Sequence, residues 1–153
     1  MKPRISSRPR AFVTNAWLDV QMPNDRLALL RAAVTSKGKF FLGTDSAPHD
    51  ISAKKGKGNT AAGVFTQPYA VAYVLTALEE AVARGDIDES RVTQELLEGF
   101  LGGFGRRFYG VEEPKERIVV EKKDEVVVES IQGEGIEVVP FRKGKPTWSV
   151  RWI

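Results

Sequence analysis

A short apolar run that ends in polar residues constrains the fold of this chain more than any other feature. Phe40 to Gly43 form the run, and Asp45 and His49, the only histidine, follow it on either side of Pro48. An unbroken apolar run of this length is typical of a strand in a parallel sheet that helices cover on both faces. In open parallel sheets and in (β/α) barrels, sites form in the loops that leave the carboxyl ends of strands. We therefore expect any chemistry of this chain at Asp45 and His49.

The composition restricts the class of protein. The 153 residues suffice for one domain with a hydrophobic core, and 23 Lys and Arg against 20 Asp and Glu leave a net charge of +3. Lysines gather at Lys54, Lys55 and Lys57, but no aromatic residue lies among them, so nucleic-acid binding is only weakly indicated. The lack of cysteine excludes disulfides and thiolate metal sites and favours a reducing compartment, the cytoplasm. No apolar run approaches the roughly 20 residues that cross a bilayer, so we expect no membrane association.

The first 22 residues show no clear hydrophobic period. Ala11 to Val20 contains enough apolar residues for one short helix or strand, and the pattern does not decide between them. Residues 1–18 are rich in Arg and Ser and poor in acids, which leaves a mitochondrial presequence open as an alternative. We treat residues 1–22 as an unassigned start.

Helical periodicity precedes the apolar run. Leu27, Leu30 and Val34 recur at i, i+3 and i+7, and they predict a helix that begins near Asn24 and ends at Gly38. A helix followed directly by a buried strand is typical of an α/β fold, so we assign the chain to that class.

Two more helices are predicted after a polar loop over residues 50–67. Pro68 suits the first turn of one helix, and Gly85 suits its end. The apolar face of that helix consists of Val71, Val74, Leu75, Leu78 and Val82. The next helix is predicted from Ser90 to Leu101, and its inward residues are Val92, Leu96, Leu97 and Phe100. We expect the glycines at 102, 103 and 105 to break it, with Arg106 and Arg107 at a solvated helix end.

The composition changes at Val111 to short β-prone runs that charged residues, Gly and Pro separate. These runs lie at residues 118–120, 126–128, 138–139 and 148–152. In the last of them Trp148, Val150 and Trp152 alternate with polar residues, as in a half-buried strand. We expect a small β extension that packs on the helical part, with these aromatic residues in the core.

The residue types at Asp45 and His49 allow two interpretations. A carboxylate at a strand end is ionised at neutral pH and can bind a divalent metal or act as a general base. His49 could face the same pocket and donate a hydrogen bond to an anionic substrate. Alternatively, Asp45 caps the turn through backbone N–H groups and His49 is merely solvated. One acid and one histidine are too few for a metal site, which needs three or four ligands.

The same stretch resembles a known family. Residues 41–49, which read FLGTDSAPH, resemble the signature of dihydroorotases of the single-function type in the amidohydrolase superfamily. The resemblance continues through AAGVF at 61–65, PYA at 68–70, FYG at 108–110, VPF at 139–141 and WSV at 148–150. It covers residues 23–153, and the GTDSAPH run is highly specific.

The resemblance implies a metal-dependent (β/α)8 TIM-barrel hydrolase, of which the chain holds the last barrel strand, its flanking helices and a small C-terminal β extension. Such enzymes interconvert dihydroorotate and N-carbamoyl-L-aspartate in pyrimidine biosynthesis, and a hydroxide between two zinc ions attacks the ring amide. By resemblance, Asp45 is the catalytic residue that ligates one metal and transfers the proton. His49 helps to hold the substrate carboxylate, and the backbone of Ala62 and Gly63 binds the ring.

The resemblance is incomplete. The family also needs a His-x-His pair, a carboxylated lysine and two further histidines upstream, whereas this chain has His49 alone. We therefore expect an incomplete barrel, an inactive isolated chain, and a strand at residues 40–43 that lacks neighbours on both edges. One alternative is a non-catalytic partner subunit that completes or regulates a catalytic chain. Another is a basic nucleic-acid-binding module, which depends on charge only.

These expectations divide the chain into three parts. Residues 1–22 are unassigned, residues 23–110 form the barrel segment and residues 111–153 form the β extension. The implied cofactor is zinc, and the implied substrate is a small molecule, dihydroorotate or N-carbamoyl-aspartate. We expect no nucleic-acid or membrane partner, and a homodimer is compatible with the complete enzyme.

Overall fold

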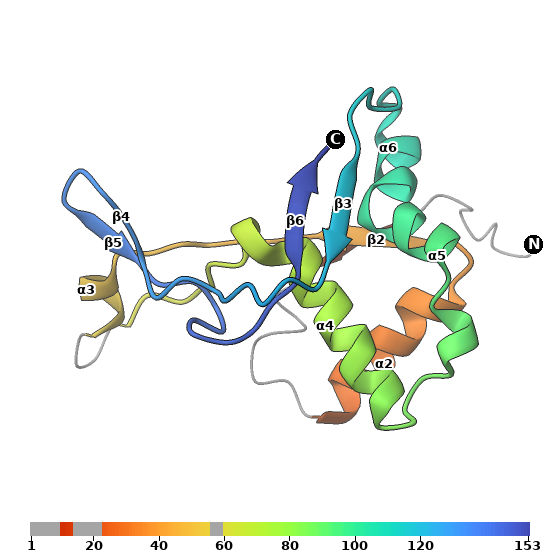
Figure 1. The fold of residues 1–153 in the computed structure, drawn as a ribbon, viewed down its shortest axis with the longest axis horizontal. Helices are drawn as coiled ribbons and strands as arrows, with labels where there is room; N and C mark the ends of the chain where they lie inside the picture. Colours follow the sequence, from red (N-terminus) through yellow and green to blue (C-terminus); the bar gives the residue numbers. More distant parts are fainter. Residues whose placement is uncertain (1–9, 14–22, 56–59) are drawn as a thin grey trace, which may run out of the picture.

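A two-stranded parallel sheet carries the candidate site in the computed structural model, which describes residues 10–13, 23–55 and 60–153 (Figure 1). Its strands, β1 (Arg10–Val13) and β2 (Phe40–Gly43), pair over their full length. The strand predicted at residues 40–43 is thus confirmed. The expectation that it lacks neighbours on both edges is wrong, because β1 occupies one edge. Apart from β1, the predicted unassigned start lies outside the described residues.

Burial of β2 is less complete than the sequence predicts. Phe41 is buried, with 5% of its surface exposed, whereas the other three residues of the strand are partly exposed. Within the described residues each sheet has only two strands, and none closes into a barrel. An extended parallel sheet has helices on both faces, which bury its strands completely. The two-stranded sheet here buries β2 less fully.

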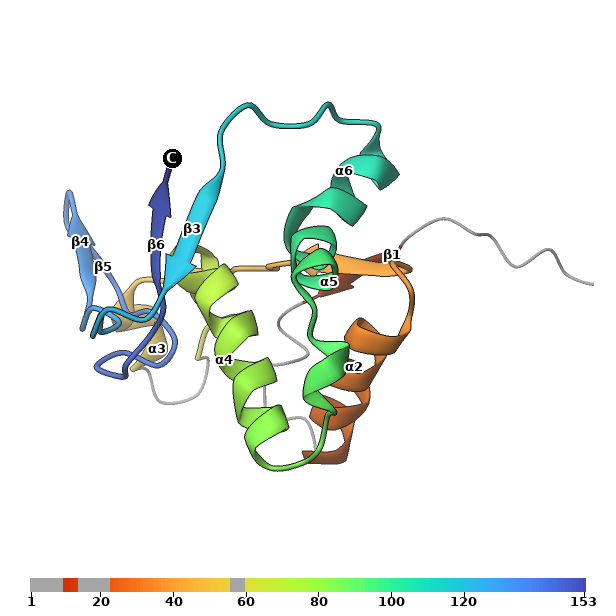
Figure 2. The same cartoon turned by 45° about the vertical axis from the view of Figure 1, so that its right-hand side comes forward.

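Three helical segments pack side by side against this sheet (Figure 2). They are α2 (Pro23–Thr35), α4 (Ala70–Ala83) and the segment that begins with α5 (Gln94–Glu98). Their shared core contains Leu30, Ala33, Val74, Leu78, Ala81, Ile87 and Phe100. Leu30, Val74, Leu78 and Phe100 belong to the predicted apolar faces, so the helical periodicity located the core.

The helix starts differ slightly from the prediction. Pro68 lies in a 3-10 turn, η1 (Gln67–Tyr69), and α4 begins directly after it. A second 3-10 turn, η2 (Glu89–Arg91), occupies the predicted start near Ser90. The helix proper starts later because the Thr93 hydroxyl accepts the Leu96 N–H at 3.2 Å, which is a standard N-cap.

The predicted helix break at the glycines is wrong. The helix continues through a π-helical turn, η3 (Gly99–Gly103), into α6 (Phe104–Tyr109), and it ends at Gly110 with φ +67°. A Cβ atom at Gly99 would lie 2.2 Å from Cζ of Phe104, and one at Gly105 would lie 3.0 Å from Cδ2 of Phe41. These glycines therefore admit aromatic rings against the helix backbone, and the π turn absorbs the change in register.

The C-terminal part forms two antiparallel pairs. β3 (Ile118–Glu121) pairs with β6 (Ser149–Trp152), and β4 (Ile131–Gly133) pairs with β5 (Ile136–Val138). The prediction that the aromatic strand is core is wrong, because Trp152 is 72% and Val150 is 42% exposed. A two-stranded ribbon leaves side chains exposed wherever no further layer packs on it. Trp148 is half-buried and lies under the Lys122 ammonium, 5.1 Å away.

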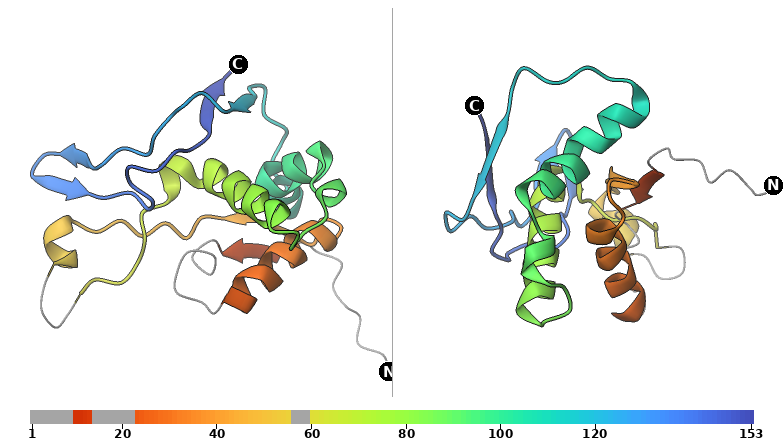
Figure 3. Two further views of the ribbon diagram at one scale, coloured as in Figure 1. Left: turned by 60° about the horizontal axis from the view of Figure 1, so that its bottom comes forward. Right: turned by 90° about the vertical axis from the view of Figure 1, so that its right-hand side faces the viewer.

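The chain after β2 leaves the sheet and runs to a short helix, α3 (Ile51–Lys54), which lies beside the β4–β5 hairpin (Figure 3). The loop predicted over residues 50–67 therefore contains one helical turn. The returning segment meets the C-terminal tail, the stretch of residues 139–148 between β5 and β6, where Phe65 forms a parallel bridge with Pro140. Two segments far apart in sequence thus form the surroundings of the candidate site.

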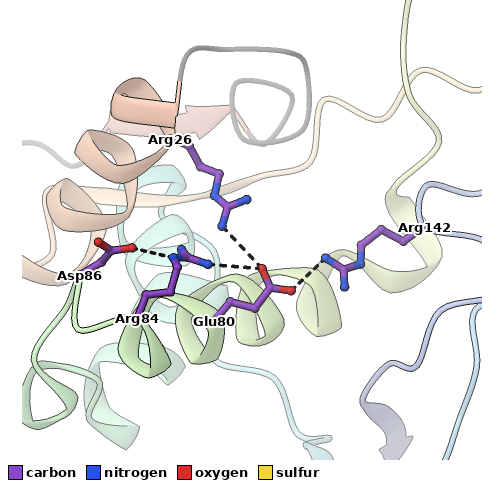
Figure 4. Close-up of polar contacts among 5 residues, drawn as sticks. All are labelled: Arg26, Glu80, Arg84, Asp86 and Arg142. Carbon is purple, nitrogen blue, oxygen red and sulfur yellow. Dashed lines mark hydrogen bonds and ion pairs between the residues drawn. The ribbon is translucent and has the colours of Figure 1, made fainter.

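Glu80 of α4 connects the helical layer with the same tail (Figure 4). Its carboxylate lies 3.5 Å from Arg26 of α2, 3.9 Å from Arg84 and 3.2 Å from Arg142 of the tail. Each of these side chains is about a third or more exposed, so each ion pair contributes little by itself. In the described ranges, no helix has the length and apolar character that crossing a membrane requires.

Candidate functional site

The turn after β2 places Asp45 at the carboxyl end of the strand, as predicted. Its side chain is exposed and its backbone adopts φ +42°, in the left-handed region that aspartate tolerates better than most residues. The neighbouring Ser46 hydroxyl accepts the N–H groups of Thr66 at 3.0 Å and Gln67 at 3.1 Å. Ser46 therefore holds the Asp45 turn against the segment that leads into α4. This role of Ser46 was not predicted, although a small hydroxyl residue inside a turn often bonds nearby backbone groups.

His49 and Gly63 lie together, although 14 positions separate them in the sequence. A Cβ atom at Gly63 would lie 3.4 Å from Nε2 of His49 and 2.6 Å from Cβ of Ala47. The Ala47 N–H also donates to the Val64 carbonyl at 3.0 Å, which aligns the two segments. Gly63 has φ +112°, so only glycine fits both this backbone conformation and this close approach. Ala62 lies in the same segment, directly before Gly63, and is exposed.

Lys54, at the end of α3, makes two contacts that the sequence did not predict. Its ammonium donates to the carbonyl oxygens of Ala61 at 2.6 Å and Gly63 at 2.5 Å. These are charge-assisted hydrogen bonds from one part-buried group, and they flank Ala62 on both sides. In the sequence, Lys54 is recognisable only as a member of the basic cluster with Lys55 and Lys57. Of that cluster, Lys57 lies outside the described residues.

Asp50 anchors the start of the same helix. Its carboxylate accepts the Ser52 N–H at 2.8 Å as an N-cap and the Glu137 N–H of β5 at 2.9 Å. The hydrogen bond from the Ser52 hydroxyl, followed by those from the Glu137 and Ser52 N–H groups, lowers the pKa of Asp50 from 3.8 to about 2. Asp50 therefore fixes α3 to the hairpin and stays ionised at neutral pH.

A pocket of about 240 Å³ opens between these segments. His49, Lys54 and Gly63 supply its polar groups. Apolar side chains from both parts of the chain complete it, namely Ala47, Ile51, Val64, Phe65, Val138, Val139 and Phe141. Asp45 and Ala62 do not line this pocket. The structure therefore brings two of the four predicted site residues, His49 and Gly63, to one pocket.

The described residues do not fit a binuclear metal site. Across residues 10–13, 23–55 and 60–153, no three His, Cys, Asp or Glu side chains lie close enough to hold an ion. The Asp50 carboxylate already accepts the bonds that cap α3 and tie it to β5. A zinc site needs at least three protein ligands, so Asp45 could supply only one part of it.

The sequence is similar to those of dihydroorotases. No protein-family model matches the chain. A dihydroorotase of Saccharomyces cerevisiae is 37% identical over 138 residues, which cover 86% of this chain and 35% of that protein. A dihydroorotase of Erythrobacter litoralis is 39% identical over 120 residues, 78% of this chain and 32% of that protein.

Solved structures show the same relation. The crystal structure of S. cerevisiae dihydroorotase in complex with 5-fluoroorotic acid matches with a TM-score of 0.73 and 33% identity, over 92% of this chain and 40% of that one. Dihydroorotase from Campylobacter jejuni matches with a TM-score of 0.62 and 25% identity, over 86% of this chain and 35% of that one. The predicted family relation is confirmed. The chain is a dihydroorotase homologue that spans only about a third of the length of the relatives it matches.

Proposed function

We propose that this chain supplies part of the site of a dihydroorotase-type hydrolase, which interconverts dihydroorotate and N-carbamoyl-L-aspartate in pyrimidine biosynthesis. The observation that carries the proposal is the meeting of His49 and Gly63 at one pocket, beside the strand end that bears Asp45. In this proposal β2 is the last strand of an incomplete (β/α)8 barrel, residues 23–110 are the barrel segment, and residues 111–153 are the β extension. The protein acts in the cytoplasm, and the complete enzyme is compatible with a homodimer.

The residues have distinct roles in this proposal. His49 donates a hydrogen bond to the carboxylate of the substrate, which is an anion at neutral pH. The backbone of Ala62 and Gly63 binds the ring through main-chain hydrogen bonds. Asp45 accepts a proton from the attacking water and returns it to the amide nitrogen as the ring bond breaks, which is general base and then general acid catalysis.

Zinc enters the proposal only because dihydroorotases are zinc-dependent enzymes. The described residues supply one candidate ligand, Asp45, so the remaining ligands would have to come from residues that this part of the chain does not contain. We therefore expect the 153-residue chain to show no dihydroorotate hydrolysis when it is purified and supplied with zinc. Turnover close to that of a complete dihydroorotase would contradict this expectation.

A chimera tests the function itself. The chain replaces the matching segment of the S. cerevisiae dihydroorotase, and dihydroorotate hydrolysis is measured with zinc present. We expect activity in the chimera and a loss of at least about 100-fold in Asp45→Asn, because a general acid-base group contributes about 10²–10⁴-fold. The matched control is Asp124→Asn, since Asp124 is also an exposed aspartate with positive φ, +54°. A folded but inactive chimera, or an active Asp45→Asn, would contradict the proposal.

A second candidate function is a non-catalytic partner subunit of a catalytic chain. The exposed apolar side chains favour it, because Tyr109, Val111, Trp152 and Ile153 are 60–72% exposed. This candidate predicts stable co-purification with a chain that carries the missing histidines. It also predicts that Asp45→Asn leaves the activity of that complex unchanged, which separates it from the first candidate.

A further inference from the structure

The Lys54 ammonium occupies an unusual position, because it bonds two carbonyls that lie two residues apart. The bonded oxygens belong to Ala61 and Gly63, at 2.6 Å and 2.5 Å, and the side chain is part-buried. The Ala61 N–H also donates to the Ala53 carbonyl at 3.1 Å, which joins the returning segment to α3. The conformation of residues 61–63 is therefore set from α3, an element outside that segment.

These contacts decide where the Ala62 amide points. In a trans peptide the carbonyl of one residue and the N–H of the next point in opposite directions in one plane, and none of the described residues has a cis peptide bond. Since the Ala61 carbonyl faces Lys54, the Ala62 N–H must face away from it. Neither Ala62 nor Gly63 donates its N–H to an acceptor within the described residues. As far as the described residues go, both donors are therefore open to a ligand that carries a carbonyl or carboxylate oxygen.

We propose that Lys54 is a positioning residue that holds Ala61 and Gly63 through its ammonium. It thereby fixes the amide of Gly63, which lines the His49 pocket, and the amide of its neighbour Ala62 for hydrogen bonds to a bound ligand. This inference rests on the proposed function, and it assigns to Lys54 a role that neither the sequence pattern nor the family resemblance provided. Lys54 acts through the backbone and does not touch the reacting atoms. The helix that carries Lys54, α3, is itself fixed to β5 by Asp50, so the position of Lys54 depends on that hairpin.

Nuclear magnetic resonance on the full 153-residue chain tests the positioning directly. Lys54→Met keeps an unbranched side chain of similar length up to the Cε position and removes the charged donor. We expect its Ala62 and Gly63 amide resonances to move, and the contact between the Gly63 α protons and the His49 ring to disappear. The matched control is Lys55→Met, because Lys55 is the exposed neighbour of Lys54. Unchanged Ala62 and Gly63 amides in Lys54→Met would overturn the inference.

The absence of cysteine allows a chemical rescue. In Lys54→Cys, the single thiol is alkylated under denaturing conditions with 2-bromoethylamine, which rebuilds an ammonium at the same distance from the backbone. Alkylation with 2-bromoethanol gives a neutral group of the same length. We expect the amine to restore the wild-type Ala62 and Gly63 resonances and the alcohol not to restore them. Equal spectra for the two adducts would show that the charged donor is not what positions the segment.

The chimeric enzyme connects positioning with ligand binding. There, Lys54→Met is expected to raise KM for dihydroorotate about tenfold and to leave kcat within about twofold, because it weakens ground-state and transition-state binding alike. A lower kcat with unchanged KM would overturn the assignment as a positioning residue. If the wild-type chimera folds without activity, the proposed function fails, whereas the resonance measurements still decide the role of Lys54.

Discussion

Gly63 shows how much of the site depends on a single residue. Its backbone has φ +112°, a conformation that residues other than glycine rarely adopt. A Cβ atom there would lie 2.8 Å from the Ala47 carbonyl oxygen as well as 2.6 Å from the Ala47 side chain. The glycine therefore allows the segment after Lys54 to touch the loop that carries His49. This contact joins the two segments at the pocket, together with the hydrogen bond from the Ala47 N–H to the Val64 carbonyl.

Gly63→Ala is expected to lower the free energy of unfolding by about 1–3 kcal/mol, because it adds backbone strain and forces Ala47 to move. The measurement is urea denaturation of the full chain. Gly85→Ala is the control, since Gly85 has φ +75° but nothing lies within 4 Å of its Cβ position. Gly85→Ala should lose less free energy of unfolding than Gly63→Ala, because it adds backbone strain without a steric clash. Equal losses for the two variants would contradict the crowding argument.

Two short elements with the same cap differ in one contact. Asp50 and Asp88 each accept the N–H and the hydroxyl of the serine two residues later, which caps α3 and η2 respectively. In each case the hydrogen bond from the serine side chain is the largest cause of a lowered pKa. Only Asp50 also accepts an N–H from β5, at Glu137. The pair therefore separates the effect of a local cap from that of a tie between elements.

This difference predicts a pH dependence. A lowered pKa in the folded chain means that the ionised carboxylate stabilises the fold above the ordinary pKa of 3.8, and that this stability disappears as the pH falls through about 2. Asp50→Asn should therefore flatten the decline of the melting temperature between about pH 4 and pH 2. It should also speed amide exchange at Glu137, whereas Asp88→Asn should leave that amide unchanged. An unchanged Glu137 exchange rate in Asp50→Asn would show that the Asp50 carboxylate does not hold β5.

The helices and strands that were predicted correctly are those whose sequence pattern lies within the element itself. Periodic apolar residues located α2 and α4, and the run at residues 40–43 located β2. The π turn was missed because glycine usually breaks a helix, and the packing of Phe104 and Phe41 that compensates for it is not visible in a local pattern. At the site, the family signature predicted His49 and Gly63. Lys54 was missed because its carbonyl partners are defined only by the folded backbone.

Over the molecule as a whole, the C-terminal tail packs on the helical part through specific contacts that no local sequence pattern predicted. The Phe141 N–H donates to the Phe65 carbonyl at 2.9 Å, and the Phe141 carbonyl accepts the hydroxyl of Tyr73 on α4. Tyr73 is only 7% exposed, and burial raises its pKa above the usual range, so its hydroxyl remains a donor. These contacts complete the pocket, because Phe141 also lines it. In contrast, Val150 and Trp152 of β6 are exposed, so the alternating aromatic pattern there does not mark a buried face.

The docking of the tail through Tyr73 can be tested by removing one oxygen atom. Tyr73→Phe leaves the buried ring in place but deprives the Phe141 carbonyl of its donor, which should cost about 1–2 kcal/mol of unfolding free energy. It should also speed hydrogen exchange at the Phe141 amide, because the bond to Phe65 depends on the same docking. Tyr109→Phe is the matched control, since the Tyr109 side chain belongs to a residue that is 66% exposed, and its cost should stay within about 0.5 kcal/mol. If both variants lost equal stability and Phe141 exchange stayed unchanged, the tail would be held by its other contacts, with Glu80 and Arg142 as the next pair to break.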